Sequence, residues 1–185
     1  MTDPAPQQTP DDPLPVDRKA PVVVALEVEV DAPMASVWTV HTDVNRWPFW
    51  HPGIGFSTLA GEMESGGALH LQLDGMAVHC QVGRVVPERE VVWSLRMFGA
   101  YGMQWWTLEA QGSRTLVRLE ESLHGWAPRL LRRTVRRTVE RSRAAWLEAL
   151  RERAESRAER DVEREPNGGE GDSGGPAEER PQAGE

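Results

Sequence analysis

The change of hydrophobic period at Trp126 is the feature that most constrains the fold. From there the apolar residues recur every three or four positions, at Leu131, Val135, Val139, Trp146 and Leu150. Arginines occupy the opposite side of this repeat. The spacing predicts one long amphipathic helix. Pro128 would lie in its first turn, where a missing backbone N–H breaks no hydrogen bond.

Before Trp126 the pattern is that of short helices and strands. Residues 22–30 alternate apolar and acidic side chains, which predicts a half-buried strand. Asp31-Ala-Pro and Asp43 are expected to start two short helices, over 34–40 and 44–50. A further strand is expected near 54–60, before Gly66-Gly67 interrupts the pattern.

Three turn motifs join the later strands into an antiparallel meander. They are Asp74-Gly75, Phe98-Gly-Ala-Tyr101 and Gln111-Gly112. The cross-strand pairs expected from them are His70 with His79, Trp93 with Trp106, Leu95 with Gln104, and Gly102 with Glu121. The predicted order is β-α-α-β6-α, an α+β domain of about seven strands. Such a sheet must cover its apolar face with the C-terminal helix, and a curved sheet around one helix favours an internal ligand cavity.

The net charge of −8 is concentrated at the two ends of the chain. Residues 1–21 are acidic and proline-rich, and residues 161–185 are rich in Gly, Pro and Glu, so both are expected to be disordered tails. One domain over 22–160 remains. Within it, residues 126–160 carry eleven arginines and five acidic residues. The use of one lysine against twenty arginines is typical of a GC-rich genome.

Several function classes are excluded on the sequence. Cys80 is the only cysteine, so no intramolecular disulfide and no cysteine-built metal site is expected. We find neither a signal peptide nor an apolar stretch long enough to span a membrane, which predicts a cytoplasmic protein without integral membrane association. Walker, dinucleotide-binding, HExxH and GxSxG motifs are missing, so no cofactor and no metal is expected.

Longer strings of sequence resemble a known superfamily. DAPMASVWTVHTDVNRWPFWHPGI, RVVPEREVVW and WWTLEAQGSRTLVRLEESLHG are similar to SRPBCC proteins, the START and birch-pollen-allergen-like helix-grip superfamily, and within it to the polyketide cyclase/dehydrase group. The resemblance covers about residues 24–155. It implies a helix-grip fold with an apolar ligand cavity and, for enzymes of bacterial secondary metabolism, cofactor-free aldol cyclisation and dehydration of a polyketide-type substrate.

Alternation along the late strands predicts which side chains face the cavity. Glu121 is the acidic member of this inward set and is the candidate proton-transfer residue, together with His124 at the cavity mouth. Gln104 would hold a carbonyl group, and Trp93 and Trp106 would form an aromatic wall. The predicted cavity residues are Trp93, Leu95, Met97, Gln104, Trp106 and Leu119 from the strands and Val135 and Val139 from the helix.

Each assignment has an alternative. Glu121 could be turned outward by a bulge or neutralised by an arginine of the helix. Arg84 points inward by strict alternation and outward if a bulge lies beside it. Cys80 is interpreted as a small buried hydrophobic residue rather than a nucleophile.

Loops and the outer face supply the remaining candidates. Phe49, Trp50 and His51 follow the second short helix and are the predicted gate. His70 and His79 are expected as a solvated cross-strand pair, because no third metal ligand is evident. Trp105 alternates outward and could form a homodimer contact.

Two functions follow from this sequence. The first is a polyketide cyclase/dehydrase-like enzyme that binds a hydrophobic or aromatic molecule. The second is a non-catalytic carrier or sensor of a lipid or small molecule. The arginine-rich helix could attract an acyl-carrier protein or another anion, but nucleic acid is not expected because the domain is neutral overall and lacks a recognised binding motif.

Overall fold

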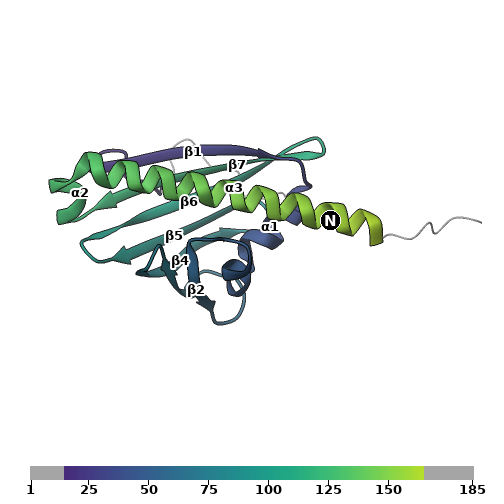
Figure 1. Ribbon diagram of the computed structural model, residues 1–185, viewed down its shortest axis with the longest axis horizontal. Helices are drawn as coiled ribbons and strands as arrows, with labels where there is room; N and C mark the ends of the chain where they lie inside the picture. The colour runs from purple at the N-terminus through teal and green to yellow at the C-terminus, as the bar shows by residue number, and fades with distance from the viewer. Residues whose placement is uncertain (1–14, 165–185) are drawn as a thin grey trace, which may run out of the picture.

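The computed structural model describes residues 15–164, and Figure 1 shows one curved sheet with a long helix along it. The expected disorder of residues 1–21 and 161–185 lies outside the described residues over 1–14 and 165–185, whereas residues 161–164 are helical. The elements are β1 (Val22–Val30), α1 (Met34–Thr42), the 3-10 helix η1 (Val44–Phe49), β2 (Ile54–Leu59), β3 (Ala68–Leu73), β4 (Met76–Val86), β5 (Glu90–Met97), β6 (Ala100–Gln111), β7 (Arg114–His124), α2 (Trp126–Leu130) and α3 (Arg132–Arg164).

The sheet is the predicted antiparallel meander, and the first strand forms one of its edges by pairing with the last strand. Its order is β1-β7-β6-β5-β4-β3-β2, with seven strands. The Asp74-Gly75 hairpin has the expected register, with His70 opposite His79. A bulge interrupts β4 between Val82 and Arg84, which confirms the bulge considered there.

Two hairpins have a register different from the prediction. The turn after β5 consists of Phe98 and Gly99 alone, so Met97 pairs with Ala100 and Trp93 lies opposite Gln104. Gly99 has a φ of +75°, which a glycine adopts at little cost. After β6 the turn is Gly112-Ser113, and Gln104 therefore lies directly opposite Glu121. Each pairing differs from the expected one by two residues, so every side chain keeps its predicted face.

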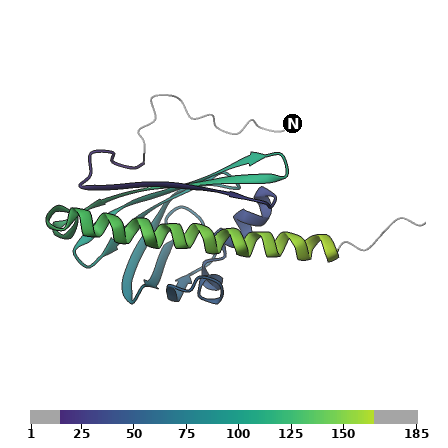
Figure 2. The ribbon, with the colours of Figure 1, turned by 45° about the horizontal axis from the view of Figure 1, so that its top comes forward.

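The C-terminal helix is interrupted once, which the prediction of a single helix missed. Leu131 separates α2 from α3 with a ψ of +35°. The backbone N–H of Ala127 donates to the carbonyl of Gly99, so α2 is attached to the β5–β6 turn. The 33 residues of α3 instead run along the sheet and contact β1 and α1 (Figure 2). The two helices therefore pack on different parts of the molecule. The hydrophobic period of the sequence does not reveal the break between them.

The described chain begins on the outer face of the sheet. Val16 is 2% exposed there, Arg18 pairs with Glu120 at 2.7 Å, and Asp17 pairs with His124 at 3.2 Å. Composition predicted disorder through residue 21, and for residues 15–20 the structure differs. One buried valine, the Arg18–Glu120 ion pair and the contact between Asp17 and His124 hold the segment, and these contacts require the folded sheet.

Candidate functional site

A buried ion pair between the sheet and α3 is the centre of the site. Glu121 of β7 receives two hydrogen bonds from Arg143 of α3, with Nε at 2.5 Å from Oε2 and Nη2 at 3.1 Å from Oε1. Both side chains are almost completely buried, 0% and 4% exposed. Burial alone would lower the pKa of Arg143, but the charge and hydrogen bonds of Glu121 outweigh it and raise that pKa.

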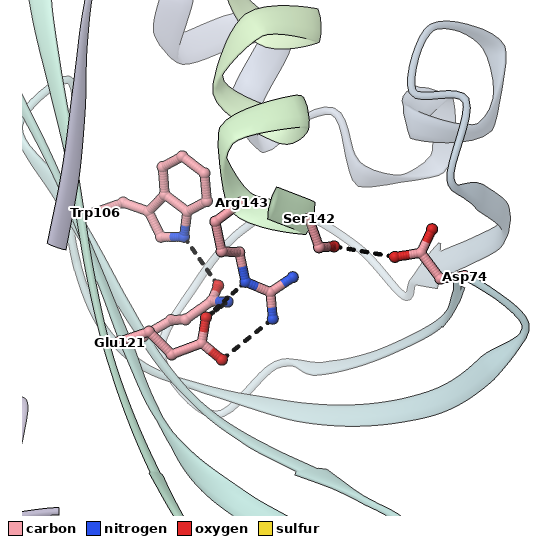
Figure 3. A network of polar contacts seen from close by, with 6 residues as sticks. Asp74, Trp106, Glu121, Ser142 and Arg143 are labelled. Atoms are coloured by element: carbon pink, nitrogen blue, oxygen red, sulfur yellow. Dashed lines mark hydrogen bonds and ion pairs between the residues drawn. The ribbon is translucent and has the colours of Figure 1, made fainter. Parts of the chain in front are cut away.

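The ion pair belongs to a longer chain of hydrogen bonds (Figure 3). The Gln104 amide donates to Glu121 Oε2 at 2.8 Å, and the Trp106 indole N–H donates to Gln104 Oε1 at 3.1 Å. This connection exists because β6 and β7 are adjacent and residues 104 and 121 are cross-strand partners. Both carboxylate oxygens of Glu121 are therefore occupied. The alternative in which a helix arginine neutralises Glu121 matches the structure, although the pair lies in the core rather than at the sheet's edge.

Aromatic rings surround this polar group. Trp47 packs edge-on against Trp146, with ring centroids 5.0 Å apart, and Trp93 lies 6.1 Å from Trp106. His41 lies among them, 4.5 Å from Trp106. Burial lowers the pKa of His41 from 6.5 to about 3, so its imidazole is neutral. Neither ring nitrogen of His41 has a hydrogen-bond partner among the described residues.

The space left between the sheet and α3 is small. A cavity of about 10 Å³ lies beside the ion pair, lined by Trp47, Leu71, Leu73, Val78, Cys80, Trp93, Leu95, Gln104, Arg143 and Trp146. Such a volume holds roughly one water molecule. Two donors here, Arg143 Nη1 and the Trp146 indole N–H, have no partner within the described chain. Two buried donors thus belong to residues that line the cavity.

The predicted cavity residues divide into two groups. Trp93, Leu95 and Gln104 line the cavity, and Trp106 and Leu119 are buried in the core around it. Met97 of β5 and Val135 and Val139 of α3 are partly buried and pack against the core from its margin. The start of α3 is largely exposed, so its valines cover the sheet less closely than periodicity suggested.

The predicted gate residues lie at different depths. Phe49 is exposed, Trp50 is partly buried, and His51 is buried with its ring 5.0 Å from Trp146. His51 Nδ1 accepts a hydrogen bond from the Gly53 N–H at 3.1 Å. Burial lowers the pKa of His51. Only the histidine of the three thus reaches the aromatic core.

His124 is a correction to the predicted site. It lies on the outer face of the sheet, where it pairs with Asp17 and stacks on Tyr101 at 5.6 Å. His124 lies three positions after Glu121 on the same strand, and an odd offset sends the two side chains to opposite faces of the sheet. His124 therefore does not join the Glu121 network.

The other outward candidates are placed as follows. His70 and His79 form the expected cross-strand pair, with their Nδ1 atoms 2.8 Å apart. Within residues 15–164, no cluster of three or more metal-binding side chains occurs. Trp105 is partly buried and donates to Glu90 at 3.0 Å, and Arg84 pairs with the same carboxylate at 2.6 Å. Cys80 is buried, and burial raises its pKa to about 12, so the thiol is protonated.

Arg143 and His41 are site residues that the sequence reasoning missed. Arg143 lies three residues before Trp146 and four before Leu147, within the apolar stripe of the helix. A charged residue inside that apolar stripe was the sequence signal that could have identified Arg143 as a buried site residue. His41 lies four residues after Val37 on the buried side of α1, a weaker signal of the same kind.

Comparisons with known proteins agree with this geometry. Residues 21–155 match the family described as polyketide cyclase/dehydrase and lipid transport. None of the curated proteins matches the sequence. None of the helices in the described part of the chain is long and apolar enough to cross a membrane.

Three solved structures illustrate the shared fold. The ZhuI aromatase/cyclase from Streptomyces sp. R1128 is 21% identical with a TM-score of 0.65, covering 79% of this chain and 98% of its own. DynU16, from the dynemicin biosynthetic locus, is 21% identical with a TM-score of 0.59 over 74% of this chain. The match covers about half of DynU16, 48% of its length. A START superfamily protein from Mycobacterium smegmatis is 18% identical with a TM-score of 0.56, covering 75% and 97%.

Proposed function

Because the chain belongs to the polyketide cyclase/dehydrase and lipid transport family, we propose that it binds an aromatic, polyketide-type molecule between its sheet and α3. The observation that carries the proposal is the pair of unpartnered donors, Arg143 Nη1 and the Trp146 indole N–H, beside a cavity walled by tryptophans. Buried donors without partners are costly, and a ligand oxygen would remove that cost. The indoles supply flat apolar surfaces on which a planar ring stacks.

The chemical class of the ligand follows from these groups. Arg143 keeps its charge in the core because Glu121 balances it, and its third nitrogen is directed to no protein acceptor among the described residues. A carbonyl or phenolate oxygen would accept from Arg143 and Trp146 together. A purely hydrocarbon lipid would leave both donors unpaired, so the site favours an oxygen-bearing aromatic molecule over a simple alkyl chain.

A ligand larger than water requires the site to open. Ser142 of α3 donates to Asp74 at the β3–β4 turn at 3.0 Å, so this bond ties the helix to the hairpin next to Arg143 (Figure 3). Both side chains are near the surface, where one hydrogen bond contributes about 0.5–1.5 kcal/mol. Separation of the hairpin from α3 would break this bond and enlarge the cavity, with the added cost of exposing the apolar side chains that the hairpin buries in the core.

Binding without catalysis is the function that the geometry supports best. Glu121 is occupied by Arg143, and His51 Nδ1 already accepts a hydrogen bond from Gly53. His41 is neutral, but tryptophans enclose it. A proton-transfer mechanism needs a free acid or base within reach of the substrate. The described site offers Arg143 as a donor to a carbonyl and offers no such base.

Cofactor-free cyclisation is the second candidate function. The observation that favours it is the guanidinium beside the cavity, since a fixed cation can stabilise the enolate oxygen that forms in an aldol reaction. Incubation of the protein with a linear poly-β-ketone distinguishes the two functions. A binding protein leaves the spontaneous product mixture unchanged, whereas a cyclase yields one cyclised product identified by mass spectrometry.

The first experiment is a binding titration with the naphthalene sulfonate dye ANS, which combines fused rings with anionic oxygens. Trp146→Phe keeps an aromatic ring and removes one donor, so we expect binding to weaken roughly three- to tenfold. Trp105→Phe makes the same change on the outer face of the sheet, away from the cavity, and is the matched control that should bind as the native chain does. Equal affinity for native protein and Trp146→Phe would exclude the indole N–H as a ligand donor.

A further inference from the structure

One end of the molecule exposes large apolar side chains in a single group. Phe98 lies at the β5–β6 turn and is 85% exposed. Trp126 begins α2, is 52% exposed and packs edge-on against Phe98 at 5.8 Å. Leu130 and Leu131, at the end of α2, are 76% and 52% exposed. We refer to these four residues as the apolar tip.

The apolar tip is held in place by specific contacts and is not a frayed loop. The Ala127 N–H donates to the Gly99 carbonyl, which attaches α2 to the β5–β6 turn. The Trp126 indole covers Gly99 so closely that an added Cβ would lie 2.9 Å from it. Aromatic residues held in this exposed position do not stabilise the core. Large exposed apolar groups of this kind mark an interaction site.

Arginines adjoin the apolar tip along one side of the helix. The cluster is Arg129, Arg132, Arg133, Arg136, Arg137 and Arg141, all exposed. From 132 onward their spacing of three and four places them on one helical face. Among the described residues, only Arg136 of this cluster forms an ion pair, with Glu140 at 2.8 Å. The other five positive charges are therefore available to a partner.

The described acidic residues of α3 do not cancel this cluster. After Glu140 the next acidic residue is Glu148, which lies seven positions, or roughly 10 Å along the helix, beyond Arg141. Charges separated by more than about 8–10 Å are screened at physiological ionic strength. The cluster thus presents a local positive surface although the net charge is −8.

We propose that the apolar tip and its arginine cluster dock the protein reversibly on the surface of an anionic membrane. Phe98, Trp126, Leu130 and Leu131 would enter the interface between headgroups and acyl chains, and the arginines would contact lipid phosphates. Tryptophan and other apolar residues next to cationic side chains are the features of interfacial membrane binding. An acidic protein partner would use the arginines and would give no reason for four exposed apolar side chains beside them.

Vesicle sedimentation with the full chain tests the proposal. We expect binding to vesicles of phosphatidylcholine mixed with phosphatidylserine and little binding to phosphatidylcholine alone. Arg132→Glu with Arg133→Glu should weaken binding by more than about twentyfold, since each basic residue contributes about fivefold. Phe98→Ser with Trp126→Ser should weaken it about tenfold or more, because aromatic burial is lost. All four positions are exposed, and circular dichroism checks the fold.

The control is Arg153→Glu with Arg160→Glu, which changes the charge equally at the other end of α3. It should bind vesicles as the native chain does, and equal loss in this control would overturn the proposal. Unchanged binding in the Phe98 and Trp126 variant would show plain charge attraction and would also overturn it. So would absence of vesicle binding combined with binding of a purified acidic acyl-carrier protein. None of these results affects the dye titration, which probes other residues.

Discussion

Arg143 is the residue on which the polar centre depends, because it supplies a charge to the core and the donor directed at the cavity. Glu121 and Gln104 hold it in place from the sheet. The cost of burying two ions is offset only while both are present. Arg143 therefore contributes both to the stability of the fold and to the proposed binding of a ligand.

Removal of one partner of this pair should be costly. We expect Arg143→Met to lower the free energy of unfolding by about 3–5 kcal/mol, because Glu121 would remain as an unpaired buried charge. The double variant Arg143→Met with Glu121→Leu should recover most of that loss. Urea unfolding of the two variants measures the difference. A double variant no more stable than the single one would show that the ion pair itself stabilises the fold.

His41 should make stability depend on pH. Its pKa is lowered from 6.5 to about 3 by burial, so the unfolded chain binds a proton more readily than the folded one. Its contribution is present in full above about pH 6.5 and is lost progressively as the pH falls towards about 3, by several kcal/mol. His51, also lowered, acts in the same direction.

Urea midpoints measured between neutral and acidic pH test this dependence. His41→Phe should flatten the profile between about pH 6.5 and 3. An identical slope in native protein and His41→Phe would assign the acid sensitivity to other groups.

At the scale of elements, α3 has two parts that differ in burial. The part from Arg143 onward buries Trp146, Leu147 and Leu150 against the sheet and α1. The part before Arg143 is mostly exposed and carries the arginines of the cluster from Arg132 onward. The division falls near Arg143, where the cavity lies. One helix thus completes the core with its later part and presents a charged surface with its beginning.

Truncation of leucines along this C-terminal region measures the division. Leu150→Ala should destabilise the protein by about 2–5 kcal/mol, because it leaves a cavity in the core. Leu131→Ala, at a position 52% exposed, should change stability by less than about 1 kcal/mol. Thermal unfolding compares the two. Similar losses at both positions would contradict the exposed placement of the helix start.

At the scale of the whole molecule, the elements pack so closely that aromatic rings occupy the space expected for a ligand. Trp47 comes from η1, Trp93 and Trp106 from the sheet, and Trp146 from α3. Their rings meet within about 5–6 Å. The same fold with smaller side chains at these positions would enclose a larger cavity. The size of the site is therefore a property of side chains from separate elements.

The arrangement of residues 15–20 on the outer face of the sheet also depends on the whole fold. Residues 15–20 lie on β7, and an open groove of about 1060 Å³ separates this segment from the outer surface of β4–β6. Asp17 and Arg18 form hydrogen bonds with residues of β7 that lie more than a hundred positions later in the chain. A segment of this composition has no local preference for order. Contacts with a distant strand decide whether it is ordered.

The sequence by itself determined the order of the strands and the face of each late strand, because these depend on local periodicity and on turn residues such as Asp74-Gly75. The family was indicated by the resemblance of longer strings of sequence. The two-residue differences in hairpin register left those faces unchanged. Only the tertiary structure decided that Arg143 meets Glu121 and that the tryptophans fill the interior. Those outcomes depend on how far α3 rotates and approaches the sheet, and packing between distant residues sets that distance.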